Sequence, residues 1–254
     1  MSVLEMQNAA KLINNGPKEK KVLLDHINLS IQENEFITVL GGNGAGKSTL
    51  FNTISGTMPL SSGKILIEDQ DLTQESEENR ASLISRVFQD PKMGTAPRMT
   101  VAENLLLAKS RGKKRRFRLR QLKQNLDNFY ELTKEVGNGL ENHLNTPTGN
   151  LSGGQRQALS LLMATIQTPE LLLLDEHTAA LDPKTSKLLM NITAQRIKEQ
   201  QLTCLMITHR MEDALQYGNR MIVMQKGKII QDLNEKEKAK LTMTDLLQFF
   251  EEIN

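Results

Sequence analysis

A glycine-rich segment between residues 41 and 48 has the residue types that bind phosphate. It reads Gly-Gly-Asn-Gly-Ala-Gly-Lys-Ser and matches the pattern G-x-x-x-x-G-K-[ST] in full. In that pattern, backbone N–H groups surround phosphate oxygens, the lysine reaches the β- and γ-phosphates, and the hydroxyl ligates Mg²⁺. A glycine-rich turn with an incidental lysine is the alternative. The predicted phosphate-binding residues are Gly41, Gly42, Asn43, Gly44, Ala45, Gly46, Lys47, Ser48 and Thr49.

Two adjacent carboxylates follow a run of leucines. The run at 171–174 is typical of a buried strand, and Asp175 and Glu176 stand at its carboxyl end, where ligands gather in open α/β sheets. Asp175 has the chemistry to hold Mg²⁺, directly or through water. Glu176 is suitably placed to polarise an attacking water. A solvated acidic pair after a strand is the alternative for these two residues.

A third motif, Leu-Ser-Gly-Gly-Gln, occupies residues 151–155. The Ser152 hydroxyl and the N–H groups of Gly153 and Gly154 can face a phosphate at the start of a helix. Because the chain already has one phosphate loop, we predict that this second cradle binds the nucleotide of another copy of the protein.

With these motifs, the sequence resembles the ATP-binding cassette (ABC) family over nearly its whole length. Three further residues resemble family motifs: Gln89 in VFQDP the glutamine loop, Asp182 in ALD the D-loop, and His209 in ITH the switch histidine. The resemblance implies that two copies enclose two ATP molecules, with Mg²⁺, in a head-to-tail dimer. Taken alone, His209 also fits a structural histidine at a strand end.

The resemblance also implies a role for each motif residue. The expected metal ligands are Ser48, Gln89 and Asp175, and the expected catalytic residues are Glu176, His209 and Gln89. Contacts to the ATP of the other copy are expected from Ser152, Gly153, Gly154, Gln155 and Asp182.

The sequence departs from the family pattern at three places. Ile13 falls where relatives carry an aromatic residue against adenine, so it is the expected adenine-facing residue. His177 follows Glu176 where a proline is usual, and it is expected to shape the loop, with coupling of the two ATP sites as the alternative. Leu161 and Leu162 stand where most relatives place an arginine.

Strand and helix patterns place these motifs in an α/β domain. Short β-prone runs at 27–31, 36–40, 171–174, 203–207 and 221–224 are separated by helix-length segments, which predicts a mostly parallel sheet with helices on both faces. Between Pro91 and about Thr148 the pattern is helical. One helix is expected to begin at the Thr100 capping box, and another carries an apolar stripe from Leu119 to Leu132. The final helix is expected to have Leu246, Leu247, Phe250 and Ile253 on its apolar side.

The predicted fold class is therefore α/β. The resemblance specifies a P-loop NTPase with a RecA-like core, an N-terminal antiparallel β subdomain and an inserted α-helical subdomain. We expect one domain over residues 1–254, with the nucleotide-binding core at 1–90 and 158–254 and the helical subdomain at 91–157.

Composition limits the classes of function. The net charge of +2 predicts no nucleic-acid partner, and one cysteine excludes an internal disulfide. No apolar run approaches the length of a membrane span, and the first residues lack the pattern of a signal peptide. We therefore expect a chain in the cytosol, peripheral to the cytoplasmic face of the membrane if other subunits hold it there.

The amino-acid sequence at residues 90–97 and 176–185 resembles that of the ATPase subunits of bacterial tryptophan/tyrosine import systems. This resemblance implies a second copy of the chain, transmembrane permease subunits and, indirectly, an extracytoplasmic substrate-binding lipoprotein as partners. The alternative is a cassette ATPase without a permease, as in iron–sulfur cluster assembly. A basic run at 111–120 fits a solvated face or, alternatively, contact with anionic lipid or an acidic permease surface.

Overall fold

The computed structural model describes residues 2–14, 20–113 and 121–251, with side chains up to residue 249. The strands are β1 Ser2–Asn14, β2 Lys20–Gln32, β3 Phe36–Leu40, β4 Ser62–Ile67, β5 Gln70–Asp71, β6 Ile84–Val87, β7 Leu171–Asp175, β8 Cys204–Ile207, β9 Arg220–Gln225 and β10 Lys228–Leu233. The helices are α1 Lys47–Ser55, α2 Glu77–Arg80, α3 Val101–Ala108, α4 Leu122–Lys134, α5 Gly153–Thr165, α6 Pro183–Glu199, α7 Met211–Gln216, α8 Glu235–Lys238 and α9 Met243–Glu251. Short 3₁₀ helices lie at Leu140–His143 and Thr148–Asn150.

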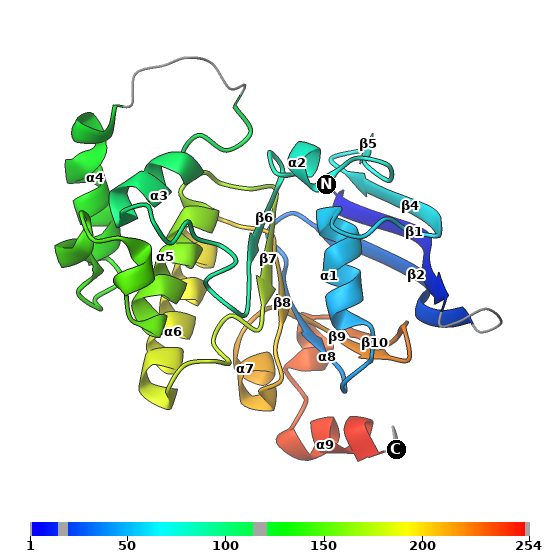
Figure 1. The fold of residues 1–254 in the computed structure, drawn as a ribbon. Helices are drawn as coiled ribbons and strands as arrows, with labels where there is room; N and C mark the ends of the chain where they lie inside the picture. Colours follow the sequence, from blue (N-terminus) through cyan, green and yellow to red (C-terminus); the bar gives the residue numbers. More distant parts are fainter. Residues whose placement is uncertain (1, 15–19, 114–120, 252–254) are drawn as a thin grey trace.

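A six-stranded sheet crosses the middle of the molecule (Figure 1) in the order β10-β9-β3-β8-β7-β6. All its neighbouring strands pair in parallel except β10, which is antiparallel to β9. The mostly parallel sheet expected from the sequence is confirmed. A sheet of this kind brings the carboxyl ends of its parallel strands to one edge.

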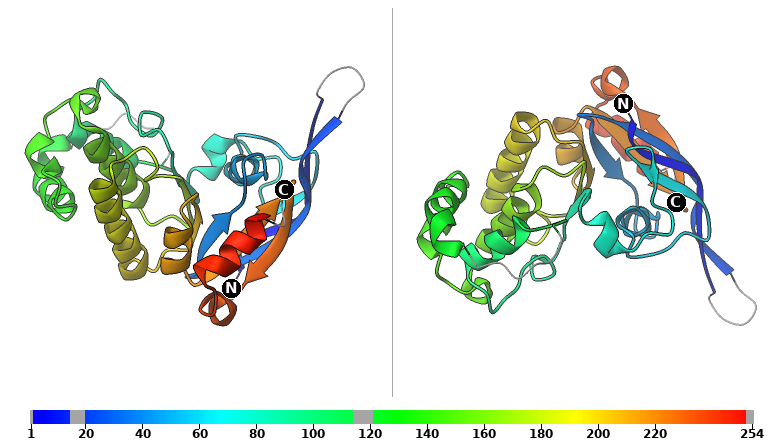
Figure 2. Two further views of the ribbon diagram at one scale, coloured as in Figure 1. Left: turned by 90° about the horizontal axis from the view of Figure 1, so that it is seen from below. Right: turned by 90° about the horizontal axis from the view of Figure 1, so that it is seen from above.

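A second, antiparallel sheet has the order β2-β1-β4-β5. Its strands β1 and β2 form a long ribbon that projects from the body of the molecule (Figure 2). The sequence indicated short strands here, and that expectation is wrong for these two. Asn8 in β1 and His26 in β2 have positive φ values of 47° and 50°, and the pairing register shifts near them. These bulges let a long ribbon form without regular alternation of apolar residues.

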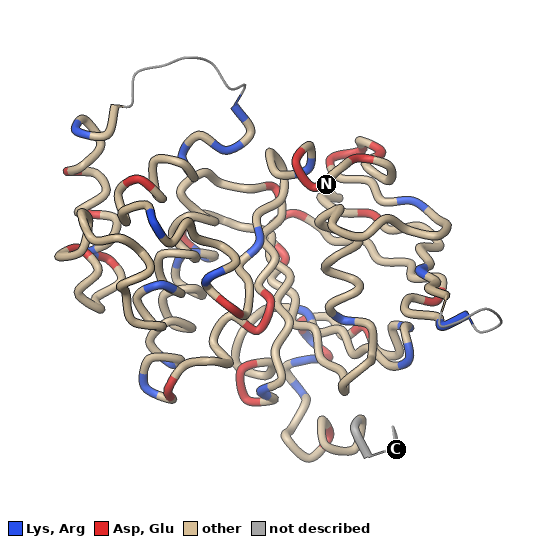
Figure 3. Tube along the Cα trace, in the orientation of Figure 1, with Lys and Arg blue, Asp and Glu red and all other residues tan. Residues whose placement is uncertain are grey.

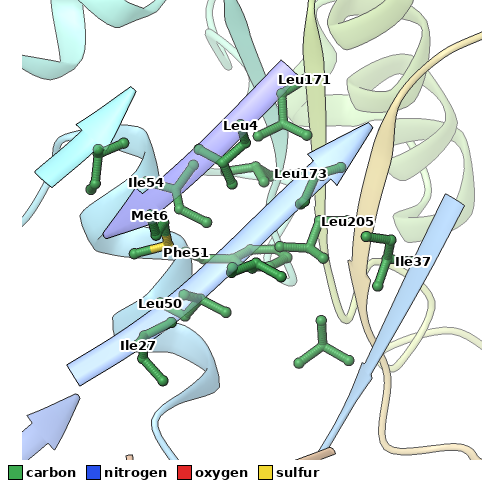
Figure 4. Packing of buried hydrophobic residues seen from close by; sticks show 14 of the residues in the cluster. Leu4, Met6, Ile27, Ile37, Leu50, Phe51, Ile54, Leu171, Leu173 and Leu205 are labelled. Atoms are coloured by element: carbon green, nitrogen blue, oxygen red, sulfur yellow. The ribbon is translucent and has the colours of Figure 1, made fainter. Parts of the chain in front are cut away.

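Helix α1 is packed between the two sheets. Figure 4 shows its residues Leu50, Phe51 and Ile54 between side chains of the ribbon and side chains of the central sheet. Odd-numbered residues of β7 face this layer, whereas Leu172 and Leu174 face the other side. That alternation is the two-residue period of a strand, so the central sheet buries both faces.

The opposite face of the central sheet is covered by helices α3, α5 and α6, with α4 further out (Figures 1 and 2). Helix α3 begins at the predicted capping box, in which Thr100 and Glu103 exchange side-chain and backbone hydrogen bonds. No strand occurs between residues 91 and 148 in the described part of the chain. The stripe on α4 is a packing face as expected, with Phe129 buried; Leu119 lies outside the described residues.

Helix α9 differs from its expected packing. Leu246 is buried against α7 and β9, but Leu247 is 46% exposed. Phe249, which the sequence pattern did not single out, packs against this cluster instead. The side chain of Phe250 and all of Ile253 lie outside the described residues.

Both signs of charge are spread over the sheet part and the helical part (Figure 3). Within residues 2–14, 20–113 and 121–251, none of the helices has the length and apolar character that crossing a membrane requires.

Candidate functional site

Four strand ends meet at one edge of the central sheet and carry the predicted chemistry. Strand β3 leads into the glycine-rich loop, β6 into Gln89, β7 into Asp175 and Glu176, and β8 toward His209. The registers Val87↔Leu174 and Asp175↔Ile207 bring these ends level with one another. Segments far apart in the sequence are thus brought together.

The glycine-rich loop bends sharply before α1. Gly46 has φ 104° and is the N-cap residue of the helix, a left-handed conformation that glycine adopts most readily. A Cβ at Gly46 would lie 2.8 Å from the Leu23 carbonyl oxygen of β2, so the close approach of the ribbon also requires glycine here. The loop therefore ends with the helix N-terminus and its free N–H groups beside it, as phosphate binding requires.

Lys47 is the buried cation of this loop. Its residue is only 6% exposed, and its Nζ donates to the carbonyl oxygens of Gly41 at 2.7 Å and Gly42 at 3.1 Å. Burial lowers the pKa of Lys47, while the charges of Glu176 and Asp175 act in the opposite direction. The ammonium group thus lies within electrostatic reach of both carboxylates.

Glu176 has an unusual backbone and a short contact to His209. Its φ is 47°, a left-handed conformation that costs a non-glycine residue about 1 kcal/mol or more. Its backbone N–H donates to the Ile207 carbonyl oxygen at 3.1 Å. The carboxylate Oε1 lies 2.6 Å from Nε2 of His209. The strained turn therefore directs the carboxylate toward the end of the neighbouring strand.

Asp175 has a partner that the sequence motifs did not reveal. Arg86 on β6 donates from Nη2 to Asp175 Oδ2 at 2.5 Å, and from Nη1 to Asn52 Oδ1 on α1 at 2.8 Å. The sequence pattern did not predict strand β6. A charged residue between the apolar Ile84 and Val87 was the sequence signal that could have drawn attention to Arg86.

The oxygen donors at this edge fit Mg²⁺ bound together with phosphates. Ser48 and Gln89 are exposed, and Asp175 is partly buried, so a hydroxyl, an amide and a carboxylate are available. Among the described residues, no three His, Cys, Asp or Glu side chains are grouped to hold a metal by themselves. Mg²⁺ usually takes one or two carboxylates plus substrate phosphates and water. The single carboxylate of Asp175, with a hydroxyl and an amide nearby, fits that protein share of the ligands.

The Leu-Ser-Gly-Gly-Gln motif forms the start of α5. Ser152 is the N-cap residue and forms a capping box with Gln155, each accepting from the backbone N–H of the other at 3.2 Å. Ser152 and Gly153 are exposed. This motif makes no hydrogen bond to the glycine-rich loop within the part of the chain that the structure describes. Its exposed face is therefore available to another molecule.

Asp182 lies at the N-cap of α6 and is also exposed. Hydrogen bonds from the side chain and backbone of Thr185 lower the pKa of Asp182. The segment packs close to the previous motif, since a Cβ on Gly154 would meet the Thr185 methyl at 2.6 Å. The two motifs expected to act across a dimer are thus neighbours on the surface.

His177 and Ile13 were singled out as departures from the family pattern. His177 is fully buried, its Nε2 lies 3.1 Å from Thr193 Oγ1, and burial lowers its pKa to about 4. Ile13 is 38% exposed on β1, paired with Lys21 of β2. The same ribbon packs the Leu23 carbonyl against Gly46, which puts Ile13 on the ribbon that borders the glycine-rich loop.

Comparison with known proteins gives close matches over the whole chain. A family model for the ABC transporter matches residues 24–179. The chain is 42% identical over 98% of its length to a tyrosine transport ATP-binding protein of Clostridioides difficile, of which it covers 99%. It is 32% identical over 91% of its length to a phosphonates import ATP-binding protein of Oceanobacillus iheyensis, of which it covers 90%.

A solved dimeric ATP-binding cassette in a post-hydrolysis state, bound to ADP and Pi, superposes with a TM-score of 0.78 at 26% identity. That match covers 91% of this chain and 98% of the other. The family resemblance, the P-loop NTPase fold class and the expectation of an ATP-binding enzyme are confirmed. The protein belongs to the ABC transporter family and is one of its ATP-hydrolysing cassettes.

Proposed function

We propose that the chain is the ATPase subunit of a bacterial ABC importer for an aromatic amino acid of the tyrosine type. The observation that carries the proposal is the identity of 42% along almost the full length of both chains to a tyrosine transport ATP-binding protein. Similarity to phosphonates and spermidine/putrescine import ATP-binding proteins is lower, at 32%, and supports import as the broader class. The cassette does not itself have to contact the cargo, so the cargo is inferred from this relative.

The residues at the strand ends supply the roles in ATP binding. In this proposal residues 41–49 bind the phosphates, with Lys47 as the principal counter-charge. Ser48, Gln89 and Asp175 hold Mg²⁺, which neutralises charge on the phosphates when it is bound. Ile13 covers the adenine by apolar contact. The support is the common edge of the sheet and the electrostatic coupling of Lys47 to both carboxylates.

Hydrolysis is assigned to Glu176 and His209. Glu176 orients and deprotonates the attacking water, and His209 contacts the γ-phosphate, with Gln89 beside them. The 2.6 Å contact between the two side chains supports the assignment because it holds the carboxylate at the strand end. A left-handed backbone at Glu176 is the kind of strain that persists at functional sites.

A second copy of the chain completes each site. Ser152, Gly153, Gly154, Gln155 and Asp182 contact the ATP held by the other copy. The support is that these residues lie at two neighbouring helix starts and that Ser152, Gly153 and Asp182 are exposed, and that a structurally similar cassette is a dimer. The helical subdomain at 91–157 presents the first of these motifs.

The proposed partners outside the dimer are transmembrane permease subunits and, indirectly, a substrate-binding lipoprotein. This places the chain at the cytoplasmic face of the membrane. The test is affinity purification of the tagged full-length chain from detergent-solubilised membranes of the organism that encodes it. We expect a polytopic membrane protein to co-purify, and we expect ATP hydrolysis by the reconstituted complex, with its binding protein, to rise with tyrosine but not with a phosphonate.

The control is the Glu176→Gln variant, purified in the same way. A complex with Glu176→Gln should assemble equally but show no stimulated hydrolysis. Recovery of the chain with iron–sulfur assembly proteins and without a membrane protein would instead support the cassette ATPase that has no permease.

A further inference from the structure

Arg86 contacts Asp175, one of the proposed Mg²⁺ ligands, but belongs to none of the ATP-binding motifs. It is on β6, three residues before Gln89, and its Nη2 donates to Asp175 Oδ2 at 2.5 Å. The exposed fractions of the two side chains are only 11% and 14%. A hydrogen-bonded contact between opposite charges that lie largely out of water is stronger than a surface ion pair.

Three further residues hold Arg86 in this position. Its Nη1 donates to Asn52 Oδ1 of α1 at 2.8 Å. Its guanidinium carbon lies 4.8 Å from the ring centre of Phe88 and 5.9 Å from that of Phe51. Such distances allow a cation–π attraction to each ring.

The backbone that follows Arg86 is anchored as well. Gln157, buried on α5, donates from Nε2 to the carbonyl oxygen of Phe88 at 2.9 Å. Fixed on both sides in this way, the guanidinium is a preorganised partner of Asp175, because little side-chain freedom remains to be lost.

We propose that Arg86 is a built-in counter-cation of the Asp175 carboxylate and that it reduces the dependence of ATP binding on Mg²⁺. The inference rests on the proposed role of Asp175 in holding the metal. With Arg86 in place, the phosphates of a metal-free nucleotide approach a neutralised carboxylate. Without it, they approach a carboxylate that has lost its hydrogen-bonded cation, and a divalent cation then offsets more of the repulsion.

A Mg²⁺ ion bound at Asp175 would contact the same carboxylate as Arg86. A fixed positive charge beside the carboxylate opposes the approach of a second cation, so Arg86 lowers the affinity of the nucleotide-loaded site for Mg²⁺. Arg86 is therefore a positioning residue: it acts on ATP and Mg²⁺ through Asp175. Its removal should affect the metal-free and the metal-loaded states in opposite directions.

The test compares ATP titrations of the full-length wild-type chain, Arg86→Met and Arg86→Lys, each with excess Mg²⁺ and with EDTA. We expect Arg86→Met to weaken metal-free ATP binding by about tenfold and to shift the Mg²⁺ concentration for half-maximal binding several-fold lower. Arg86→Lys keeps the charge, so its metal-free affinity should stay within about threefold of wild type.

A double variant identifies the cause. In Arg86→Met combined with Asp175→Asn, neither charge is left, and metal-free ATP affinity should return to within about twofold of wild type. Thermal unfolding without nucleotide supplies a second readout, because an unpaired buried carboxylate destabilises the fold. The double variant should therefore unfold at a higher temperature than Arg86→Met, even if Arg86→Met is too unstable to titrate.

The outcomes separate this inference from the proposed function. If Arg86→Met binds metal-free ATP as tightly as wild type, or if Arg86→Lys loses as much affinity as Arg86→Met, the counter-cation role is wrong. A double variant that is no more stable than Arg86→Met would also overturn it. If wild type binds no ATP with or without Mg²⁺, the proposed function itself fails.

Discussion

Helix α1 has a buried cation at each end, and the two ends differ in what the cation contacts. At the N-terminus, Lys47 donates to two carbonyl oxygens of the glycine-rich loop and faces two carboxylates. At the C-terminus, Arg80 is 1% exposed, and its hydrogen bonds to the described residues all go to backbone carbonyl oxygens. These are the carbonyls of Thr53 and Ile54 at 2.7 Å, Leu72 at 2.5 Å, Thr73 at 3.3 Å and Glu75 at 3.1 Å.

The dipole of α1 favours a cation at one end of the helix and disfavours it at the other. A cation is favoured at a helix C-terminus and opposed at an N-terminus. Arg80 therefore stabilises the fold, since it donates to carbonyl groups at the end of α1, where a helix leaves carbonyls without intrahelical donors. Lys47 is placed against the dipole, so its position is explained by its proposed role in phosphate binding rather than by stability.

Replacing Lys47, at the N-terminus of α1, with alanine should weaken ATP binding and leave the stability of the fold nearly unchanged. We expect Mg-ATP affinity to fall by on the order of a thousandfold, because the phosphates lose a buried, hydrogen-bonded counter-charge. The melting temperature should change little, since Asp175 and Glu176 keep their contacts to Arg86 and His209. Isothermal titration with Mg-ATP, together with thermal unfolding, measures both quantities.

Replacing Arg80, at the C-terminus of α1, with methionine is the matched control: it should lower the stability of the fold and leave ATP binding nearly unchanged. Several carbonyl groups lose a charged donor in a buried setting, so the free energy of unfolding should drop by about 3 kcal/mol. The Mg-ATP affinity of the protein that remains folded should stay near wild type. A variant with full stability but weak ATP binding would show that the two ends are not separable in this way.

His177 follows Glu176 in the chain, yet it is as fully buried as Arg80. Thr193 donates its hydroxyl to the Leu189 carbonyl at 2.8 Å, so the Thr193 oxygen accepts from a proton on Nε2 of His177. Burial holds the pKa of His177 at about 4, below the ordinary 6.5. The neutral form is therefore favoured in the folded state.

The sign of the pH effect follows from that shift. The unfolded chain takes up a proton below pH 6.5, whereas the folded chain does so only near pH 4, so stability should fall across this window as pH decreases. The loss assigned to His177 should be about 1 kcal/mol at about pH 5.5. Denaturant unfolding at several pH values, with His177→Gln as the control, checks it: the step should be missing in the variant.

The strand ends at the glycine-rich loop and at Asp175 could be predicted from the sequence because each follows a continuous β-prone run. The runs at 36–40 and 171–174 are strands β3 and β7, and the sheet then brings their carboxyl ends to one edge. The start of α3 was predictable for a local reason, since a capping box is formed by residues three apart.

Other features depend on contacts that local pattern does not encode. The pairing of Arg86 with Asp175 joins residues far apart in the sequence. The long β1–β2 ribbon depends on bulges at Asn8 and His26, and these residues break the alternation that identifies a strand. On α9, the exposed Leu247 and the packed Phe249 follow from how the helix lies on α7, which periodicity alone does not determine.

If this edge of the sheet is an ATP site completed by a second copy of the chain, blocking hydrolysis should trap a dimer. The most direct measurement is the mass of Glu176→Gln by size-exclusion chromatography with light scattering, in saturating Mg-ATP. The amide keeps the shape of the side chain and removes the base, so the ATP-bound dimer should accumulate. Wild type hydrolyses its ATP and should remain monomeric.

The matched control adds Ser152→Asp to Glu176→Gln. Aspartate is also a good N-cap residue, so α5 should stay intact, but its charge would face the phosphates of the other copy and prevent the dimer. We expect a mass of twice 28.6 kDa for Glu176→Gln with Mg-ATP, and a monomer for the double variant. A Glu176→Gln chain that binds Mg-ATP yet stays monomeric, or that hydrolyses ATP at the wild-type rate, would contradict it.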